Sequence, residues 1–196
     1  LVGILTWQVW DADGVIIIQK PEAAKCCAFF KGRLVLGNLL GFPSRIRWSY
    51  PGEPTQFSTS TDAYRDCGKN DGGEITGLRV FRGSLVIFKT NSIWVLNGDV
   101  DETNYVIFEA VPGRGCVAPN TICCDGDTRI LFQSAHGLLT FDLATVPEIP
   151  VSDPIQDDFH DLEILTRADF FCAGIDTRNR TYEVALTPTD ATTNTK

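Results

Sequence analysis

The sequence lacks methionine altogether and contains only two histidines, His136 and His160. Because position 1 is leucine, we expect the chain to be an internal piece or a processed form of a longer protein. No apolar run approaches the roughly 18–20 residues that a membrane-spanning helix needs. No C-x-x-C motif occurs, and two histidines cannot complete a zinc-finger spacing. These absences argue against a membrane helix and a zinc finger.

Basic residues are also in deficit: 17 Lys and Arg stand against 25 Asp and Glu, and the formal net charge is -8. Broad affinity for nucleic acid comes from clustered Lys and Arg, so this balance argues against it. The short basic segments Lys31-Gly32-Arg33 and Arg45-Ile46-Arg47 alternate with uncharged residues. Such alternation is typical of the solvated face of a strand.

Seven cysteines are present, but their arrangement does not favour a disulfide framework. Cys26-Cys27 and Cys123-Cys124 are adjacent pairs in β-rich segments, where neighbouring side chains point to opposite faces. The total is odd, and the remaining three cysteines stand alone in the sequence. We therefore expect free thiols, mostly small buried hydrophobes, in a protein that folds in a reducing cytoplasm.

An internal repeat of strand, tight turn and strand dominates the chain. The turns contain Lys31-Gly32, Arg82-Gly83, Asp125-Gly126 and Arg178-Asn179, residue types that tolerate the positive φ of hairpin loops. Successive turns are spaced 43–52 residues apart, which is close to the period of about 40–50 residues in β-propeller blades. The spacing therefore predicts propeller blades.

The second repeat shows four strands, predicted at Ile75–Phe81, Ser84–Thr90, Ser92–Leu96 and Tyr105–Val111. Four antiparallel strands are what one blade requires. The prediction is an all-β fold, a β-propeller with about four modules that forms part of a larger propeller. A β-sandwich, or a string of unrelated hairpins, is the alternative, because short regularly spaced strands suit those folds too.

The predicted organisation is propeller blades over residues 1–186 and a polar tail over residues 187–196. Within the blades, residues 1–20 form a leading hairpin, and the modules cover residues 21–60, 75–112, 117–150 and 168–186. The leading hairpin is a remnant of a preceding blade, and the last module lacks its outer strands. Only Asp157 to Arg167 has a pattern compatible with a short helix.

Candidates for catalysis and metal binding are few. His136 follows Ser134 by two residues, but the glycine after it indicates a turn rather than a Ser–His relay. The acidic segment Asp157–Asp161, which contains His160, suits a solvated loop better than a cation site. The segments Asp11–Gly14 and Asp125–Asp127 begin like calcium loops but lack the glutamate at position 12. We therefore predict no catalytic, cofactor-binding or metal-binding residue, no cofactor and no enzyme activity.

Residues 32–142 carry a resemblance to a known family. The order GRLVLGN, RIRWSYPGEPTQF, GGEITGLRVFRGSLVIFKTNSIWVLNGD and GRGCVAPNTICCDGDTRILFQSAHGLLTFD is similar to virion structural proteins of tailed bacteriophages. Within them, the sequence resembles the propeller-bearing tail nozzle or tail tubular proteins of short-tailed phages. The combination is more specific than any one of these segments alone.

The resemblance implies a virion (tail) protein that is assembled in the cytoplasm of the host bacterium. It also implies a ring of copies, often six, around the DNA exit channel, in contact with a tail adaptor or other virion proteins. DNA would pass without sequence-specific contact, and no membrane would be spanned. A carbohydrate- or peptide-binding propeller of a secreted or surface protein is the alternative, and a propeller hydrolase is a third, less favoured class.

Overall fold

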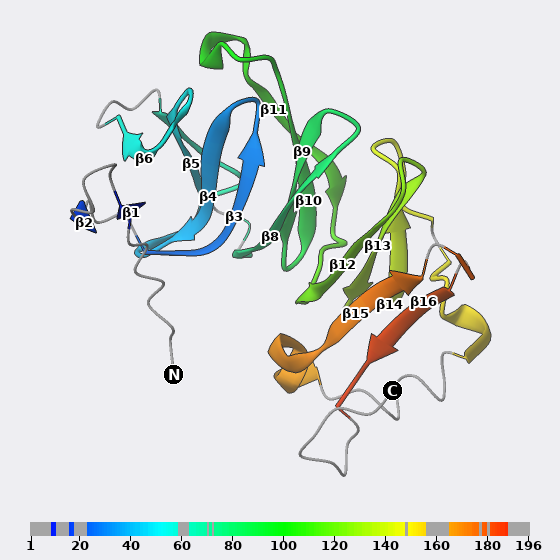
Figure 1. The fold of residues 1–196 in the computed structure, drawn as a ribbon. Coiled ribbons are helices and arrows are strands. Elements are labelled where there is room, and N and C mark those ends of the chain that lie inside the picture. The colour runs from blue at the N-terminus through cyan, green and yellow to red at the C-terminus, as the bar shows by residue number, and fades with distance from the viewer. Residues whose placement is uncertain are drawn as a thin grey trace.

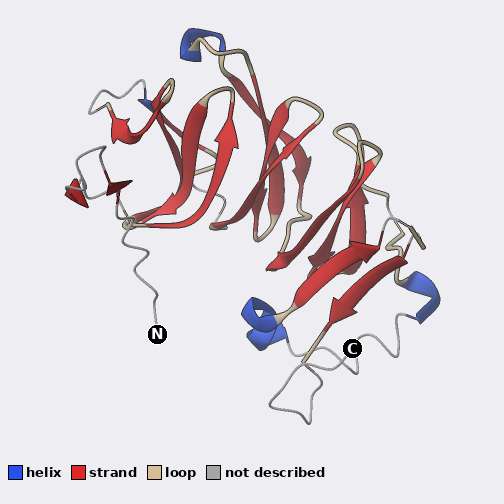
Figure 2. Cartoon of the chain, in the orientation of Figure 1, coloured by secondary structure: helices blue, strands red, loops and turns tan. Residues whose placement is uncertain are grey.

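A computed structural model describes residues 9–10, 16–17, 23–58, 63–69, 71, 73–147, 149–155, 165–176, 178–179 and 181–187. Figure 2 shows that strands make up most of this part of the chain. The helical segments described are 3-10 turns at Glu102–Asn104, Asp153–Ile155 and Leu165–Phe170. No helix in these ranges is long and apolar enough to cross a membrane. The predicted all-β class is confirmed.

The strands form antiparallel sheets that follow one another in chain order. The first sheet contains β3 (Ala24–Phe30), β4 (Arg33–Leu39), β5 (Phe42–Tyr50), β6 (Glu53–Phe57) and β7 (Tyr64–Asp66). The second contains β8 (Ile75–Phe81), β9 (Ser84–Lys89), β10 (Ser92–Asn97) and β11 (Val106–Pro112). The third contains β12 (Ala118–Asp125), β13 (Arg129–Ser134) and β14 (Gly137–Phe141). The fourth contains β15 (Cys172–Asp176) and β16 (Thr181–Ala185).

Glycine-containing turns open the first two sheets as the sequence predicts. Lys31 and Gly32 have φ values of 48° and 78°, and Arg82 and Gly83 have 47° and 77°. Two consecutive positive φ values define the hairpin turn whose twist matches that of the flanking strands. Gly126 also has a positive φ, 54°, in the turn between β12 and β13. The three glycines therefore lie in the first turns of successive sheets, at the places where the sequence predicts hairpin turns.

The sheets lie side by side along an arc, with the first strand of each on the inner side (Figure 1). Strand β3 contacts β8, β8 contacts β12, and β12 contacts β15. Close approach is required at Gly77 of β8, where an added Cβ would lie 2.5 Å from Cδ1 of Ile122 in β12. The arrangement places one face of each sheet against the next sheet.

The core lies between the sheets, in three separate clusters. One joins the first and second sheets, one joins the second and third, and a smaller one joins the third and fourth. Because the second sheet is covered on both faces, β9 is a continuous apolar run rather than an alternating one. Leu85 and Ile87 pack toward the first sheet, and Val86 and Phe88 pack toward the third. All four side chains are fully buried.

Strand predictions for the second repeat agree with β8 to β11 to within one residue at each end. Trp48 and Trp94 lie on third strands, β5 and β10, as equivalent strands would require. They point in opposite directions, however: Trp48 pairs with Val35, whereas Trp94 pairs with Ile87, and both tryptophans pack in the cluster between the first two sheets. The two positions are therefore not equivalent within the repeat.

Some strands at the two ends of the chain differ from the prediction or lie partly outside the described residues. β7 was not predicted; it pairs with β5 beside the predicted end of the first module. In the leading segment, β1 (Val9–Trp10) pairs with β2 (Ile16–Ile17), as the predicted hairpin requires. The fourth sheet has two strands in the part of the chain described. The segments 157–164 and 188–196 lie outside the described residues.

Candidate functional site

The sequence pointed to a few residues as candidates for catalysis or metal binding. Those that the structure describes lie in turns and make local contacts. His136 is exposed in the turn between β13 and β14, and its backbone N–H donates to Oγ of the buried Ser134 over 3.4 Å. Asp125 pairs with Arg129 across the turn between β12 and β13. His160, the acidic segment 157–161 and the segment 11–14 lie outside the described residues. Within the described ranges, no three His, Cys, Asp or Glu residues gather as a metal site would need.

All seven cysteines lie in the described part of the chain and have free thiols. Cys26 and Cys27 point to opposite faces of β3, one toward the core and one to solvent. Burial raises the pKa values of Cys26, Cys67 and Cys116 to about 12. At neutral pH these three groups are therefore thiols, whereas nucleophilic attack and metal binding require thiolates.

Charged side chains connect the first sheet to the second and the second sheet to the third. Arg33, buried at the start of β4, pairs with Glu102 and donates to the backbone oxygen of Val100 over 3.2 Å, both in the loop between β10 and β11. Arg82, in the first turn of the second sheet, donates to backbone oxygens in the third sheet, those of Asp127, Thr128 (3.0 Å) and Asp142 (3.2 Å). Both arginines thus connect neighbouring sheets through side-chain contacts.

Lys89, at the end of β9, binds the loop that joins the first and second sheets. Its ammonium group is fully buried and donates to the backbone oxygens of Cys67 (2.7 Å) and Gly68 (3.0 Å), and it pairs with the carboxylate of Asp71. All three donors of the ammonium group are used. Lys89 was not predicted as a buried residue, although a lysine at the end of the apolar run Leu85–Phe88 is a signal in the sequence.

The outward face of the first sheet, which points away from the second sheet, is built from aromatic and basic side chains. The guanidinium of Arg45 lies over the rings of Phe42 and Tyr64, 4.0 and 3.8 Å from their centroids. It also binds both carboxylate oxygens of Asp66, over 2.7 and 3.0 Å. This hydrogen bonding lowers the pKa of Asp66. Arg47 lies over Phe57 on the same face.

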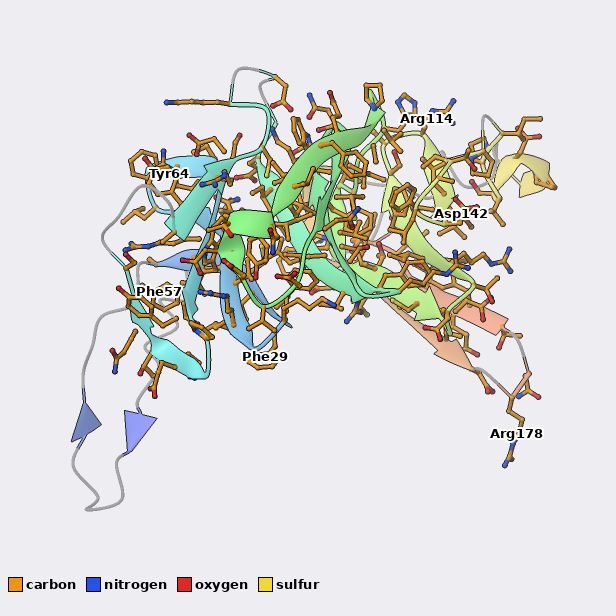
Figure 3. All side chains as sticks on the ribbon, turned by 90° about the horizontal axis from the view of Figure 1, so that it is seen from above. Phe29, Phe57, Tyr64, Arg114, Asp142 and Arg178 are labelled. Carbon is orange, nitrogen blue, oxygen red and sulfur yellow. The ribbon has the colours of Figure 1, made fainter. Side chains whose placement is uncertain are left out.

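Figure 3 shows that Phe57 and Tyr64 lie at one end of the molecule and Arg178, in the turn of the fourth sheet, lies at the other. Phe29, on the outward face of β3, is 65% exposed. These are the two end faces of the arc over the residues that the structure describes. The stacked aromatic and basic side chains on the outward face of the first sheet are the candidate functional site.

A polar hollow of about 370 Å³ lies between the first two sheets, lined by Pro43, Ser44, Lys69, Gly73, Glu74 and Thr90. It contains no aromatic ring on which a sugar could stack. The carboxylate of Glu74 is already held by Lys25 (2.7 Å) and Asn38 (3.0 Å). The hollow therefore offers little for recognition of a carbohydrate.

A scan against protein-family models finds no match for the chain, and a search of the curated proteins finds none either. The resemblance of residues 32–142 and the geometry of the sheets are therefore the basis for a proposed function.

Proposed function

We propose that this chain is part of a β-propeller that serves as a structural component of a bacteriophage virion. In that role it is a tail nozzle or tail tube protein whose copies form a ring around the DNA exit channel. The observation that carries the propeller is the arc of successive sheets whose first strands touch on the inner side. That order, with the first strand innermost, is what radial repetition of blades produces.

The charged contacts between sheets support a role in which the protein must withstand mechanical force. Arg33, Arg82 and Lys89 each use charge-assisted hydrogen bonds to join parts of the chain that lie on different sheets or on the connecting loop. Such bonds resist changes in the angle between sheets, which a conduit for a packaged genome must keep under pressure. The acidic balance, -8 overall, also suits a wall past which DNA slides without binding.

A binding assay combined with light scattering tests this proposal against the carbohydrate- or peptide-binding alternative. The purified chain is measured by multi-angle light scattering and then applied to glycan and peptide arrays. The proposal predicts assemblies larger than one chain and no saturable ligand. A stable monomer that binds one sugar or peptide with a defined stoichiometry would overturn the virion proposal and support the alternative.

A further inference from the structure

The segment that follows β14 contacts both the second and the third sheet. It leaves β14 at Asp142 and returns to the edge of the same strand, where the N–H of Val151 donates to the carbonyl oxygen of Leu138 over 2.8 Å. The N–H of Leu138 in turn donates to Oγ of Ser152 over 3.1 Å. We call residues 142–152 the strap; the structure describes all of them except residue 148.

Two arginines of the second sheet hold the strap. Arg82, in the turn between β8 and β9, donates to the carbonyl oxygen of Asp142 over 3.2 Å, and Arg114, in the loop after β11, donates to that of Pro147. Both bonds lie at the surface, where competition from water leaves each of them a modest net contribution. The described residues of the strap contain no strand, so the strap is attached at separate points rather than by a continuous ladder of hydrogen bonds.

The start of the strap has an unfavourable backbone conformation. Leu143 has a φ of 78°, in the left-handed region that costs free energy for any residue with a Cβ. The N–H groups of Ala144 (3.0 Å) and Thr145 (2.9 Å) both donate to one carboxylate oxygen of Asp142 and hold this turn in place. The contacts of the closed strap must therefore offset the cost at Leu143, and opening relieves it.

Little apolar surface holds the strap closed. Leu143 and Val146 are the described strap side chains that pack against the cluster between the second and third sheets, and both are only partly buried. Ile149 and Val151 are 66% and 49% exposed, whereas the neighbouring strand β13 is buried along all but its first residue. A segment with few buried apolar contacts opens at a lower free energy than the sheets around it.

We propose that the strap opens and closes as one unit while the sheets remain folded. The left-handed conformation of Leu143 favours opening, and the contacts of Arg82 and Arg114 with the strap oppose it. Opening uncovers the part of the cluster on which Leu143 and Val146 pack, and it frees the N–H and carbonyl groups of Leu138 at the edge of β14. The inference concerns a segment within one chain and does not depend on the proposed tail role.

Hydrogen exchange of the full 196-residue chain, resolved to single amides by mass spectrometry with electron-transfer fragmentation, tests the proposal. The reporters are the N–H groups of Ala144, Thr145 and Val151, each of which is hydrogen-bonded in the closed strap. We expect these three amides to have similar protection factors, roughly tenfold or more below those of β13. Protection factors equal to those of β13 would show that the strap opens only when the protein unfolds, and they would overturn the proposal.

The effect of Leu143 is tested by two variants that both remove most of its side chain. Leu143→Ala keeps the Cβ and therefore the backbone penalty, whereas Leu143→Gly removes that penalty. We expect the protection of the strap amides to be about fivefold higher in Leu143→Gly than in Leu143→Ala, with equal protection of β13 in the two variants. Equal protection of the strap amides would refute Leu143 as the residue that favours opening.

Arg114→Ala tests whether the strap opens as one unit. Arg114 contacts the strap at Pro147, in its middle. Its loss should nevertheless lower the protection of the amides at both ends of the strap, by roughly three- to tenfold. The matched control is Arg129→Ala, which removes an exposed arginine that pairs with Asp125 within the third sheet and should leave the strap unchanged. A decrease confined to one end of the strap, or the same decrease in the control, would contradict the proposal.

Discussion

Replacing Lys89 by methionine tests whether its buried contacts with the loop between the first two sheets stabilise the fold. The change keeps the length and the apolar stem of the side chain but removes the ammonium group. It removes the donor to the backbone oxygens of Cys67 and Gly68, and it leaves the Asp71 carboxylate with the Gly73 N–H and the Ser92 hydroxyl as its remaining donors. Breaking a buried ion pair on one side costs about 3–5 kcal/mol. Since the Asp71 side chain is 25% exposed and regains some hydration, we expect a loss near the lower end, about 3 kcal/mol.

Urea unfolding followed by tryptophan fluorescence measures this loss, at a protein concentration held constant between variants. The matched control is Lys25→Met, which removes a lysine paired with Glu74 at the surface, where both side chains are largely exposed. Exposed pairs contribute roughly 0–1 kcal/mol. A loss below about 1 kcal/mol for Lys89→Met, or equal losses for the two variants, would refute the assignment of Lys89 as a buried fastening.

Further predictions concern thiols, acid stability and the histidines. In dilute native protein, maleimide should label Cys27 and Cys172 but not Cys116, whose pKa of about 12 keeps it protonated; all seven thiols should react in urea, and early labelling of Cys116 would contradict its burial. The lowered pKa of Asp66 stabilises the fold fully above the ordinary carboxyl pKa of about 4 and less as the pH falls through the lower native value. The difference in stability between the native chain and Asp66→Asn, measured by thermal unfolding, should therefore decrease as the pH is lowered. If this difference stays the same at acidic pH, the ion pair with Arg45 is not the cause of the stabilisation. Replacing each histidine by alanine should leave the oligomer distribution in light scattering unchanged, and loss of assembly would assign that histidine a role.

The hairpin turns were predictable because they depend on local chemistry. Gly32 and Gly83 are needed where the backbone takes a positive φ, and the runs after them are β-branched and apolar. For the same reason the strand bounds of the second sheet could be predicted almost to the residue.

Contacts between distant segments could not be predicted in this way. The Lys89 ammonium group binds Cys67 and Asp71, which are 22 and 18 residues away in the sequence. The strand β7 was missed because Tyr64-Arg65-Asp66 is short and polar, and it is held by pairing with β5 rather than by its own apolar pattern. The contacts of Arg33 and Arg82 with the neighbouring sheet were not predicted. The repeat does not show them, because Arg33 follows its turn glycine and Arg82 precedes its own.

The orientation of the two tryptophans shows a further limit. Trp48 and Trp94 lie on corresponding third strands, yet their positions along those strands differ by one residue, which turns their rings to opposite faces. Sequence spacing located the strands but not the faces, and the faces decide which sheets pack together.

Electron microscopy of the assembled chain tests the central claim most directly. Class averages of the purified oligomer should show rings with rotational symmetry and an open channel on the axis, surrounded by propeller-like lobes. Rotational symmetry of order six would agree with the tail nozzle resemblance. Isolated lobes, or closed propellers without a channel between copies, would contradict the account of this chain as a ring-forming conduit of a phage tail.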